Sequence, residues 1–597
     1  MKLQIGKMRQ QNGNVPIRKG RYMKRKLVGM LAAVLLLTQG CAAEEKRKSD
    51  YDIPIVDEEA AGQEDEEIRD TQPETEQTEG EDMAQAANTD KEAKIHYSPE
   101  GYCMWDNWYV ERDGEIHLIH LKGLAGGMDY DTAKENRRGY GHAVSTDLVH
   151  WSEQADILSL EESTNPFDRD FRYTGCTIER DGVYYTFYTM RKGQGQRIGV
   201  ATSEDLYEWE EYEGNPVLVP DEKWFITFAN ENVSNHAAWG ATVDCRDMLV
   251  IKDEEGEGYW GYFVASADTG RTSPAAVIGV AYSYDLLEWE QLGIAYTPRG
   301  VSMPEMVDVF QIGEKWYMTL TTAKNNGCIS GFSDPYITRA QIYAVADSPI
   351  GPFVENPDDN VMMGGQINSG YSSRSIIFNG KRRVLYTDSN NGEAVLSLPK
   401  DVAVNEEGHL RLYYAADLLE NLRTGTLPDM IAVQPNTSFA WNTKGGVWRK
   451  EENIYSCTTD ENSWQSFLMR GMANNMELEF VMDAESDCAM LGIVLSSEGD
   501  GKLLNDLNHI LALDLQNNRV YLTDAEWDLE NCREYVFEEK KEYHFRMILL
   551  GGTIELYIDD ELVFNSGIRN TGANRAGLFV NDGSIWVREL GFYSLED

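Results

Sequence analysis

The 597-residue chain is poor in basic side chains and in cysteine, and both shortages exclude classes of protein. It has 54 Lys and Arg against 100 Asp and Glu, a formal net charge of −46 at pH 7. Nucleic-acid binding needs basic surfaces that displace counterions, so no nucleic-acid partner is expected. Eight cysteines without a C-x-x-C pair argue against a dense disulfide framework and against a zinc site. A phosphate-cradling glycine loop is also missing, so we expect neither a metal nor an organic cofactor.

Apolar runs long enough to span a bilayer are missing too. The eleven-residue run Leu27–Leu37 follows a basic segment and suits the apolar part of a signal peptide. Gly40 and Cys41 follow it and resemble a bacterial lipoprotein signal, in which the cysteine is lipidated. Thr38 departs from the usual leucine, so plain secretion stays open as the alternative. We predict a signal peptide with a lipoprotein-like cleavage site over 1–41 and an extracellular protein, held at the surface of a bacterium by a lipid on Cys41.

Residues 42–95 are short of the aromatic and aliphatic side chains that a folded core requires. The tract is rich in Glu, Gln and Thr and includes the acidic run Glu64–Glu67. Such a composition buries too little apolar surface to fold, and like charges keep the chain extended. We therefore predict a disordered acidic tether here rather than an interaction tail.

Helix signals are scarce in the rest of the chain, and a strand-type phrase recurs instead. The pattern G-x-A-x-S-x-D-L-x-x-W occupies Gly141–Trp151, Gly199–Trp209 and Gly279–Trp289, with a fainter copy over Tyr343–Phe353. Its alternation predicts a half-buried strand, and its Ser and Asp side chains are suited to closing the turn that follows. Repeats at this long spacing are typical of a β-propeller, in which each repeat forms one four-stranded blade.

Two folded all-β regions are expected. Residues 96–425 contain short aromatic strands divided by turns, and blades of roughly 60 to 65 residues would make this region a five-bladed β-propeller. Residues 426–597 contain longer alternating segments such as Met476–Met482 and Thr553–Ile558. This pattern predicts a C-terminal β-sandwich, two sheets packed face to face.

Three acidic residues stand just before strands of different blades: Asp106, Asp247 and Glu305. Singly they are ambiguous, because an acid among tryptophans is either a turn former or a desolvated catalytic group, and an Arg–Asp pair is usually a surface ion pair. The innermost strands of a propeller meet at one funnel, so all three side chains are expected to point into it. Hydrolysis of a glycosidic bond needs two carboxyl groups, and a third can hold substrate hydroxyls.

Two further features are candidates for substrate contact. His142 lies in the first repeat, where a structural hydrogen bond is the alternative role. The polar segment 230–239, which includes Trp239, is too long for a tight turn and is predicted to form a loop at the substrate rim.

The chain resembles the β-fructosidase clan, glycoside hydrolase families 32 and 68, over almost its whole folded length. The phrase Gly141–Trp151 resembles the clan's W-G-H-A-x-S-x-D-L-x-x-W element, and Tyr173–Cys176 resembles its F-S-G-S. The segment Leu398–Arg423 resembles the passage out of the propeller. Trp105–Trp108 is similar to the W-D-x-W of family 68, whereas family 32 usually has N-D-P-N-G there.

The resemblance implies an Asp nucleophile, a second Asp that stabilises the transition state and a Glu acid/base. By position these are Asp106, Asp247 and Glu305. It also implies a set of substrate-binding residues: Trp105, Asn107, Trp108, Tyr173, Arg246 and Arg374. The expected function is an exported glycosidase of the β-fructofuranosidase type, which cleaves fructosyl linkages of an oligosaccharide or polysaccharide with retention.

Several positions depart from the family pattern. Met248 replaces the proline of R-D-P, Met306 replaces the cysteine of E-C, and Tyr371–Arg374 stands in place of an aromatic, acid-rich segment. Two alternatives therefore stay open. One is a family 43-like furanosidase or pentosidase, and the other is a surface lipoprotein that binds glycans without cleaving them.

Overall fold

The computed structural model describes most of the chain from Ala93 onward. The described ranges are 93–124, 139–159, 171–192, 195–227, 243–269, 275–299, 301, 304–323, 339–365, 370–390, 393–426, 431–432, 448–470, 475–496, 507–524, 529–568 and 575–596. The predicted signal peptide, Cys41, nearly all of the tether and the rim loop with Trp239 lie outside them. Within these ranges no helix is long and apolar enough to cross a membrane.

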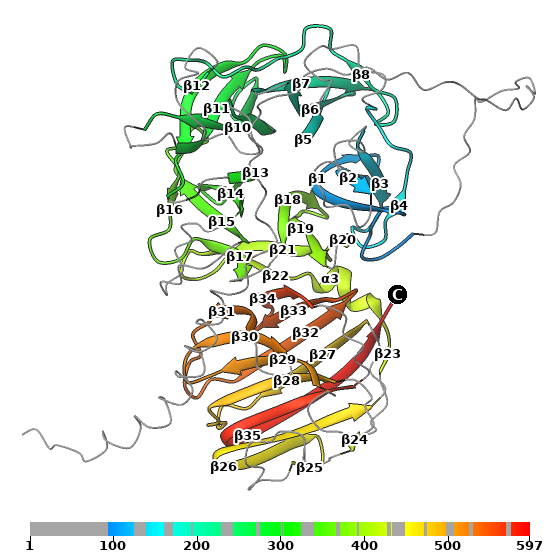
Figure 1. Ribbon diagram of the computed structural model, residues 1–597, viewed down its shortest axis with the longest axis vertical. Coiled ribbons are helices and arrows are strands. Elements are labelled where there is room, and N and C mark those ends of the chain that lie inside the picture. The colour runs from blue at the N-terminus through cyan, green and yellow to red at the C-terminus, as the bar shows by residue number, and fades with distance from the viewer. Residues whose placement is uncertain are drawn as a thin grey trace, which may run out of the picture. The chain divides into compact units, whose positions relative to one another are not determined.

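Four separate antiparallel sheets form propeller blades, each starting at the innermost strand (Figure 1). The first two contain β1 (Tyr102–Arg112), β2 (Glu115–Leu124), β3 (Gly141–Ser145), β4 (Ser152–Glu153), and β5 (Phe171–Arg180), β6 (Val183–Lys192), β7 (Gly195–Ser203), β8 (Glu210–Glu211). The next two contain β9 (Cys245–Lys252), β10 (Tyr259–Ala267), β11 (Ala275–Ser283), β12 (Glu290–Tyr296), and β13 (Pro304–Ile312), β14 (Lys315–Ala323), β15 (Arg339–Ala346), β16 (Val354–Glu355), β17 (Val361–Gly365).

The predicted count of five blades is wrong, since four blades close as separate sheets within the described ranges. The strands expected to form the fifth are β18 (Tyr371–Phe378), β19 (Lys381–Asn390), β20 (Glu393–Leu396), β21 (Lys400–Val404) and β22 (Leu410–Tyr414). They continue into the C-terminal sheet, because β22 pairs with β34 through Tyr413 and Glu561. The outer edge of this group is thus paired rather than free, which removes an exposed sheet edge.

The ring is closed by contacts between inner strands. Strand β1 contacts β5, β5 contacts β9, β9 contacts β13, β13 contacts β18, and β18 contacts β1. The chain enters this arrangement at Lys94, whose backbone N–H donates to the Trp151 carbonyl at 3.0 Å. Ile95 is already buried. The propeller contacts therefore begin just before the expected boundary at residue 96.

The repeated phrase forms the third strand of a blade and the turn after it, as predicted. In the first copy, Ser145 Oγ accepts from the backbone N–H of Leu148 at 2.9 Å, and Asp147 Oδ1 accepts from that of Val149 at 2.9 Å. The Trp151 indole N–H donates to the Leu148 carbonyl at 3.2 Å. The copies at Gly199–Trp209 and Gly279–Trp289 make the same hydrogen bonds. One turn therefore recurs in three blades.

The C-terminal region is a β-sandwich, as predicted, whose two layers share strands β26 and β35. Its strands are β23 (Arg423–Thr426), β24 (Ile431–Ala432), β25 (Arg449–Glu451), β26 (Ile454–Arg470), β27 (Met476–Met482), β28 (Met490–Ser496), β29 (Leu507–Asp514), β30 (Arg519–Asp524), β31 (Leu529–Glu534), β32 (Tyr543–Leu550), β33 (Thr553–Ile558), β34 (Glu561–Gly567) and β35 (Arg575–Leu595). The first part of β35 pairs with β28 and its last part with β27.

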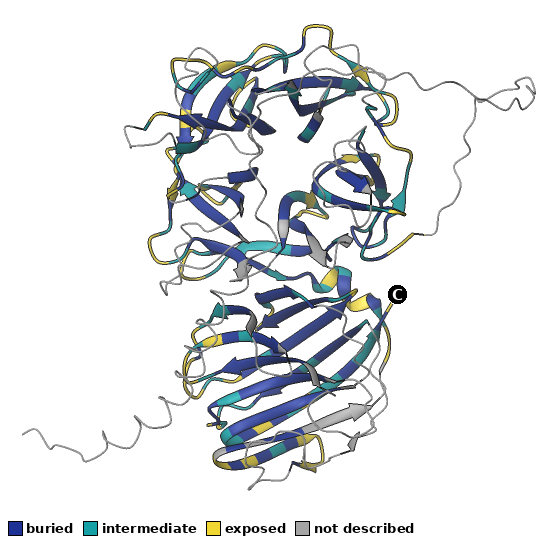
Figure 2. Ribbon diagram, in the orientation of Figure 1, coloured by how far each residue is buried: buried dark blue, intermediate teal, exposed yellow. Residues whose placement is uncertain are grey.

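One apolar core lies between these layers, and both contribute to it. Leu478 and Phe545 come from β27 and β32, and Leu491 and Leu511 come from β28 and β29. Figure 2 shows the resulting buried strands in dark blue. Between the propeller strands and β23, a short helix α3 (Ala416–Leu419) and the 3₁₀ turn η4 (Glu420–Leu422) carry the chain across.

Candidate active site

Each inner strand of the ring is interrupted by a β-bulge near its start. The ladders shift register at Asp106 in β1, at Thr174 in β5, around Asp247 in β9, around Met306 in β13 and around Ser372 in β18. Four of these residues have left-handed backbones: φ is 37° at Asp106, 54° at Asp247, 54° at Met306 and 62° at Ser372. A bulge turns a side chain away from the regular alternation, and bulges are common beside active sites. The strained backbone conformations therefore occur where the predicted acids lie.

Asp106 is buried and is held by hydroxyl groups from two neighbouring strands. Ser372 Oγ of β18 donates to Asp106 Oδ1 at 2.7 Å. Thr174 Oγ1 of β5 donates to Asp106 Oδ2. Each carboxylate oxygen thus has its own hydroxyl donor, which fixes the plane of the group and stabilises its ionised form. The bulge at Asp106 is what places this carboxylate between β5 and β18.

Asp247 and Glu305 lie on adjacent strands that are joined at the site. The backbone N–H of Met306 donates to Asp247 Oδ2 at 3.1 Å, and Arg246 Nη2 donates to the Pro304 carbonyl at 3.1 Å. Arg246 Nε lies 3.8 Å from Asp247 Oδ2. Glu305 itself is buried, with only 6% of its surface exposed. The two bonds therefore tie the stretch of β13 that carries Glu305 to the acid of β9.

The electrostatics place the three acids in one cluster. The pKa of Asp247 is raised from 3.8 to about 7, first by burial and then by the negative charges of Asp106 and Glu305, against the opposing effects of Arg246 and the Met306 N–H. Carboxylates that raise each other's pKa must lie close together in a poorly solvated space. The cluster therefore retains a proton near neutral pH, as acid/base chemistry requires.

The structure brings together Asp106, Asp247, Glu305 and Arg246, as the sequence predicts. Arg246 is more constrained than expected, because its Nη1 donates to Asp244 Oδ1 at 2.8 Å in addition to the bond with Pro304. The bond to Pro304 joins β9 to β13, so Arg246 helps to hold the site together.

Three predicted substrate-binding residues pack inside the protein instead. The Asn107 amide donates to Thr387 Oγ1 at 2.7 Å and accepts from the Tyr109 hydroxyl at 2.7 Å. Trp108 is 1% exposed and its indole N–H donates to Thr177 Oγ1 at 3.0 Å. Both side chains thus make links within the propeller, and their contact with substrate stays a prediction.

His142 is the third such residue. It is fully buried on the third strand of its blade, with its Nε2 2.9 Å from His117 Nδ1. Its pKa is lowered to about 3, first by burial and then by His117 and His120. The structural hydrogen bond, which was the alternative role, is the one observed.

The remaining described candidates lie around the acid cluster. Trp105 is half-buried and packs against two core clusters of the first blades. Tyr173 directly precedes Thr174, and its hydroxyl accepts from Arg191 Nη1 at 3.3 Å. Arg374 is buried two residues beyond Ser372, and its Nη2 lies 3.4 Å from the Asp247 carbonyl. Trp239 lies outside the described residues.

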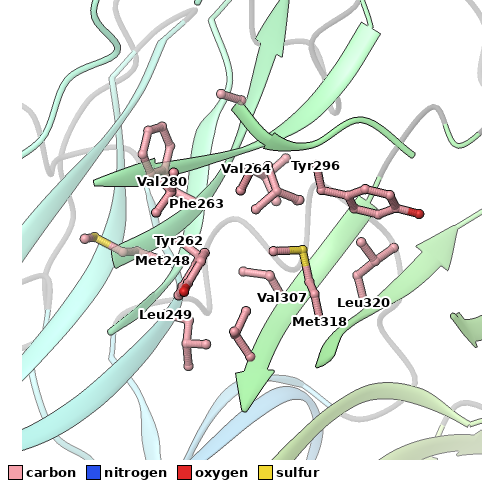
Figure 3. Close-up of a cluster of buried hydrophobic side chains, with 14 of the residues drawn as sticks. Met248, Leu249, Tyr262, Phe263, Val264, Val280, Tyr296, Val307, Met318 and Leu320 are labelled. Atoms are coloured by element: carbon pink, nitrogen blue, oxygen red, sulfur yellow. The ribbon is translucent and has the colours of Figure 1, made fainter. Parts of the chain in front are cut away.

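Met248 and Met306, which replace the family's proline and cysteine, are both fully buried. Figure 3 shows Met248 among Leu249, Tyr262 and Val280, in the apolar cluster shared by the third and fourth blades. Met248 thus contributes to packing behind the acids. Its methionine side chain adapts readily to an irregular space.

The hydroxyl residues of the site were not identified from the sequence. Thr174 and Ser372 donate to Asp106, and Thr189 Oγ1 accepts from the Asp247 backbone N–H at 3.0 Å. Thr174 lies inside the F-S-G-S-like element, so its signal was present in the motif. Ser372 and Thr189 carry no local signal, because each acts on a residue far away in the sequence.

Within the described ranges, no group of three or more His, Cys, Asp or Glu side chains has an arrangement that could hold a metal ion. The six cysteines in those ranges are buried and form no disulfide bonds: Cys103, Cys176, Cys245, Cys457, Cys488 and Cys532.

Comparison with known families supports this arrangement. Residues 128–370 match the family described as "Glycosyl hydrolases family 32 N-terminal domain". Residues 128–370 are thus similar to that domain. The match includes Asp247 and Glu305 and begins after Asp106, whose assignment to the same site rests on the contacts above.

The curated relatives are distant. An acid beta-fructofuranosidase AIV-18 of Capsicum annuum is 26% identical over 370 residues, which cover 55% of this chain and 51% of that protein. A levanase of Bacillus sp. (strain L7) is 25% identical over 389 residues, which cover 59% of this chain and 37% of that protein. The matches to these relatives thus cover about half of their length or less.

Solved structures share the fold of this chain. A GH32 beta-fructofuranosidase of Bombyx mori superposes with a TM-score of 0.59 at 16% identity, covering 84% of this chain and 94% of that one. A sucrose-6-phosphate hydrolase of Lactobacillus gasseri gives a TM-score of 0.62 at 14% identity, covering 84% and 93%. At these identities the likeness concerns the fold.

Proposed function

We propose that the protein is a glycosidase that cleaves fructosyl linkages of the sucrose or fructan type with retention. The observation that carries this proposal is the convergence of three buried carboxyl groups from β1, β9 and β13 in a chain similar to the family 32 domain. The acids of β1 and β13 both raise the pKa of the acid on β9, so the three share one space. Retaining hydrolysis requires a nucleophile and an acid/base about 5 Å apart, and such a cluster can supply both.

In the proposed mechanism, Asp106 attacks the anomeric carbon of the fructosyl unit. Its carboxylate is ionised and oriented by Thr174 and Ser372, so it forms the new C–O bond without first losing a proton. Glu305 gives its proton to the departing glycosidic oxygen as that bond breaks. Glu305 then takes a proton from water, whose oxygen displaces Asp106 and restores the starting state.

Asp247 stabilises the positive charge that develops on the sugar in this scheme. Arg246 and the Met306 N–H favour its ionised form, against burial and the two neighbouring acids. When Asp106 becomes esterified its negative charge disappears, so ionisation of Asp247 becomes easier at that stage. The three acids are thereby coupled through the reaction.

The test measures product release by the full-length chain from sucrose, inulin, levan and a panel of arabinosides. Fructose release that falls by at least about 10⁴-fold in Asp106→Asn would support the proposal. Glu355→Gln is the matched control, because Glu355 is equally buried but lies on β16 of the fourth blade, away from the inner strands. Methanol added as acceptor should give the methyl fructoside with the anomeric configuration of the substrate.

The other outcomes separate the alternatives. Release of arabinose but not fructose would move the substrate class to that of a family 43-like furanosidase. Glycan binding without turnover by either protein would favour the non-catalytic surface lipoprotein.

We propose further that the protein is exported and anchored by a lipid on Cys41. The support is the sequence around Leu27–Leu37 and Gly40 alone. Labelling with a radioactive fatty acid should mark the unmutated chain and not Cys41→Ala; equal labelling would contradict the assignment.

A further inference from the structure

Ser372 is held in an unusual backbone conformation at the bulge of β18. Its φ of 62° is uncommon for a residue with a Cβ atom, and its side chain has no exposed surface. A left-handed non-glycine residue is strained and persists where the surroundings fix it. The bulge aims its hydroxyl at Asp106 Oδ1, 2.7 Å away.

The surroundings of Ser372 fix every polar group that it has. Its backbone N–H donates to Thr321 Oγ1 of β14 at 3.2 Å, and its carbonyl accepts from the Asn107 amide of β1 at 3.2 Å. Thr321 is held in turn by Gln341, whose Nε2 donates to Thr321 Oγ1 at 2.7 Å. Hydrogen bonds from β1, β14 and β15 therefore fix the position of the Ser372 hydroxyl.

We propose that Ser372 is a positioning residue for Asp106, acting with Thr174 to orient the carboxylate and keep it ionised. This inference rests on the proposed role of Asp106 as nucleophile. An ionised oxygen has two acceptor directions, so a hydroxyl on one leaves the other for the anomeric carbon. A hydroxyl on each oxygen prevents rotation of the group, and orientation is a large part of the rate advantage of a nucleophile.

The charged groups around Asp106 make this hydrogen bond consequential. The carboxyl group of Asp247 on β9 interacts with Asp106 and also with Glu305 on β13, and Arg246 on β9 is the cation beside Asp247. Two neighbouring acids favour protonation of a third, and a protonated Asp106 is a poor nucleophile. Hydroxyl donors oppose this effect because they bond best to the ionised form.

The test compares Ser372→Ala with Ser373→Ala in the full-length chain. Alanine keeps the Cβ atom, so the backbone strain at φ 62° is unchanged and only the hydroxyl is removed. Ser373 is the matched control, because its Oγ donates to Gln341 Oε1 at 2.9 Å and not to Asp106. We expect kcat/KM to fall by about 10- to 100-fold in Ser372→Ala and by less than about 3-fold in Ser373→Ala.

The decisive readout is pH dependence. The acid limb of kcat/KM should move to higher pH by about 0.5 to 1 unit in Ser372→Ala and stay in place in Ser373→Ala. The same shift should appear in the carboxyl titration of the chain labelled with ¹³C-aspartate, where the Asp106 signal is the one missing from Asp106→Asn. This second readout needs no turnover, so it tests Ser372 even if the proposed activity fails.

An unchanged titration of the Asp106 signal in Ser372→Ala would overturn the proposal. So would an equal loss of activity in both serine variants, since that would mean a general effect of the segment. A shifted titration in a protein that releases no sugar would uphold the contact and refute the function.

Discussion

The funnel of the propeller and the sandwich both bury carboxylates, but they compensate the charge differently. In the sandwich, Glu477 is 1% exposed and contacts two guanidinium groups, Arg423 at 2.7 Å and Arg546 at 2.8 Å. In the funnel, Asp247 has one guanidinium group at 3.8 Å and two carboxyl groups near it. Around Glu477 in the sandwich, cations match or outnumber anions. Around Asp247 in the propeller, anions outnumber cations.

The pKa shifts follow this difference. Burial raises the pKa of Asp247, and its acidic neighbours add to the rise. Burial also acts to raise the pKa of Glu479, but hydrogen bonds from Tyr593 and Arg423 outweigh it and lower that pKa. Burial alone therefore does not mark a functional acid. The informative sign is a buried acid whose neighbours are other acids.

The strands show the same contrast. Around Phe480 and Phe545, β27 and β32 pair in unbroken register from Met476 to Met482. The inner strands of the propeller lose register at Asp106, Asp247 and Glu305. Regular ladders support packing, whereas the bulges re-aim side chains at a backbone cost. This contrast can be tested by substitutions in the propeller and in the sandwich.

The largest effect is expected for Glu305→Gln, which removes a proton donor and leaves the shape. Activity on sucrose should fall by about 10³-fold or more, because the departing oxygen no longer receives a proton. Substrates whose leaving group needs no proton should lose much less, which initial rates on an activated fructoside would reveal. An equal loss on both kinds of substrate would contradict the acid role of Glu305.

The sandwich side is tested by Arg546→Met. Arg546 contacts Glu477, donates to Asp560 Oδ1 at 2.7 Å and lies over the Tyr414 ring. Its loss leaves a buried acid partly uncompensated, and we expect the free energy of unfolding to fall by about 3 kcal/mol.

Arg588→Met is the control for that variant, since Arg588 pairs with Glu542 and Glu589 at the surface. Its cost should be much smaller than that of Arg546→Met, because solvent screens an exposed ion pair. Denaturant titration of both variants measures the difference in the free energy of unfolding. Equal losses in the two variants would contradict the distinction between buried and exposed ion pairs.

A smaller and opposite effect is expected for Asp247→Asn. The folded protein keeps the Asp247 proton up to about pH 7, while the unfolded chain releases it near 3.8. The unfolded state therefore binds fewer protons between these values, and stability falls as pH rises from about 4 to 7. The asparagine variant lacks this loss, so it should be more stable than the unmutated protein above pH 7, by about 1–3 kcal/mol.

Urea unfolding at pH 4 and pH 8 tests this prediction. The stability difference between Asp247→Asn and the unmutated protein should be small or reversed at pH 4 and favour the variant at pH 8. A difference that is constant with pH would show that Asp247 is ionised throughout.

The smallest effect is expected at His150, a half-exposed histidine between Asp147 and Glu596. Burial acts to lower its pKa, but the hydrogen bond and charge of Asp147 and the charge of Glu596 raise it overall. Its contribution to stability is thus present below pH 6.5 and is lost as pH rises through the raised pKa. His150→Gln should cost a few tenths of a kcal/mol at pH 5.5 and nothing at pH 9, measured by thermal unfolding. A cost that persists at pH 9 would contradict the ionic origin.

Local features of this protein were predictable because their causes are local. The turn after each repeated strand depends on Ser145 and Asp147 and on residues at most six positions away. The acids were identified because each stands at the start of a strand. Their meeting follows from the ring, in which inner strands face one another.

The features that the sequence alone did not reveal have equally definite causes. Asn107 and Trp108 are next to Asp106 in the sequence, but only Asp106 occupies the bulge, so its neighbours point into the packed interior. Ser372 acts on Asp106 across 266 positions, a separation that no local pattern encodes. The merging of the expected fifth blade with the sandwich depends on one pairing of Tyr413 with Glu561, which is equally remote.

That merging has a consequence for how the protein can be divided. Tyr386 of β19, beside the inner strand β18, donates to Glu555 Oε1 of β33 at 2.6 Å, and Lys400 of β21 contacts the same carboxylate. Tyr557 donates to the other oxygen at 2.6 Å. A chain cut after residue 425 would expose the edge of β22. Tyr386 and Lys400 would also lose their partner Glu555, one strand away from Ser372. The propeller ring is therefore not a detachable module, and we expect recombination with other domains to be tolerated only outside the stretch from Lys94 to the end of β35.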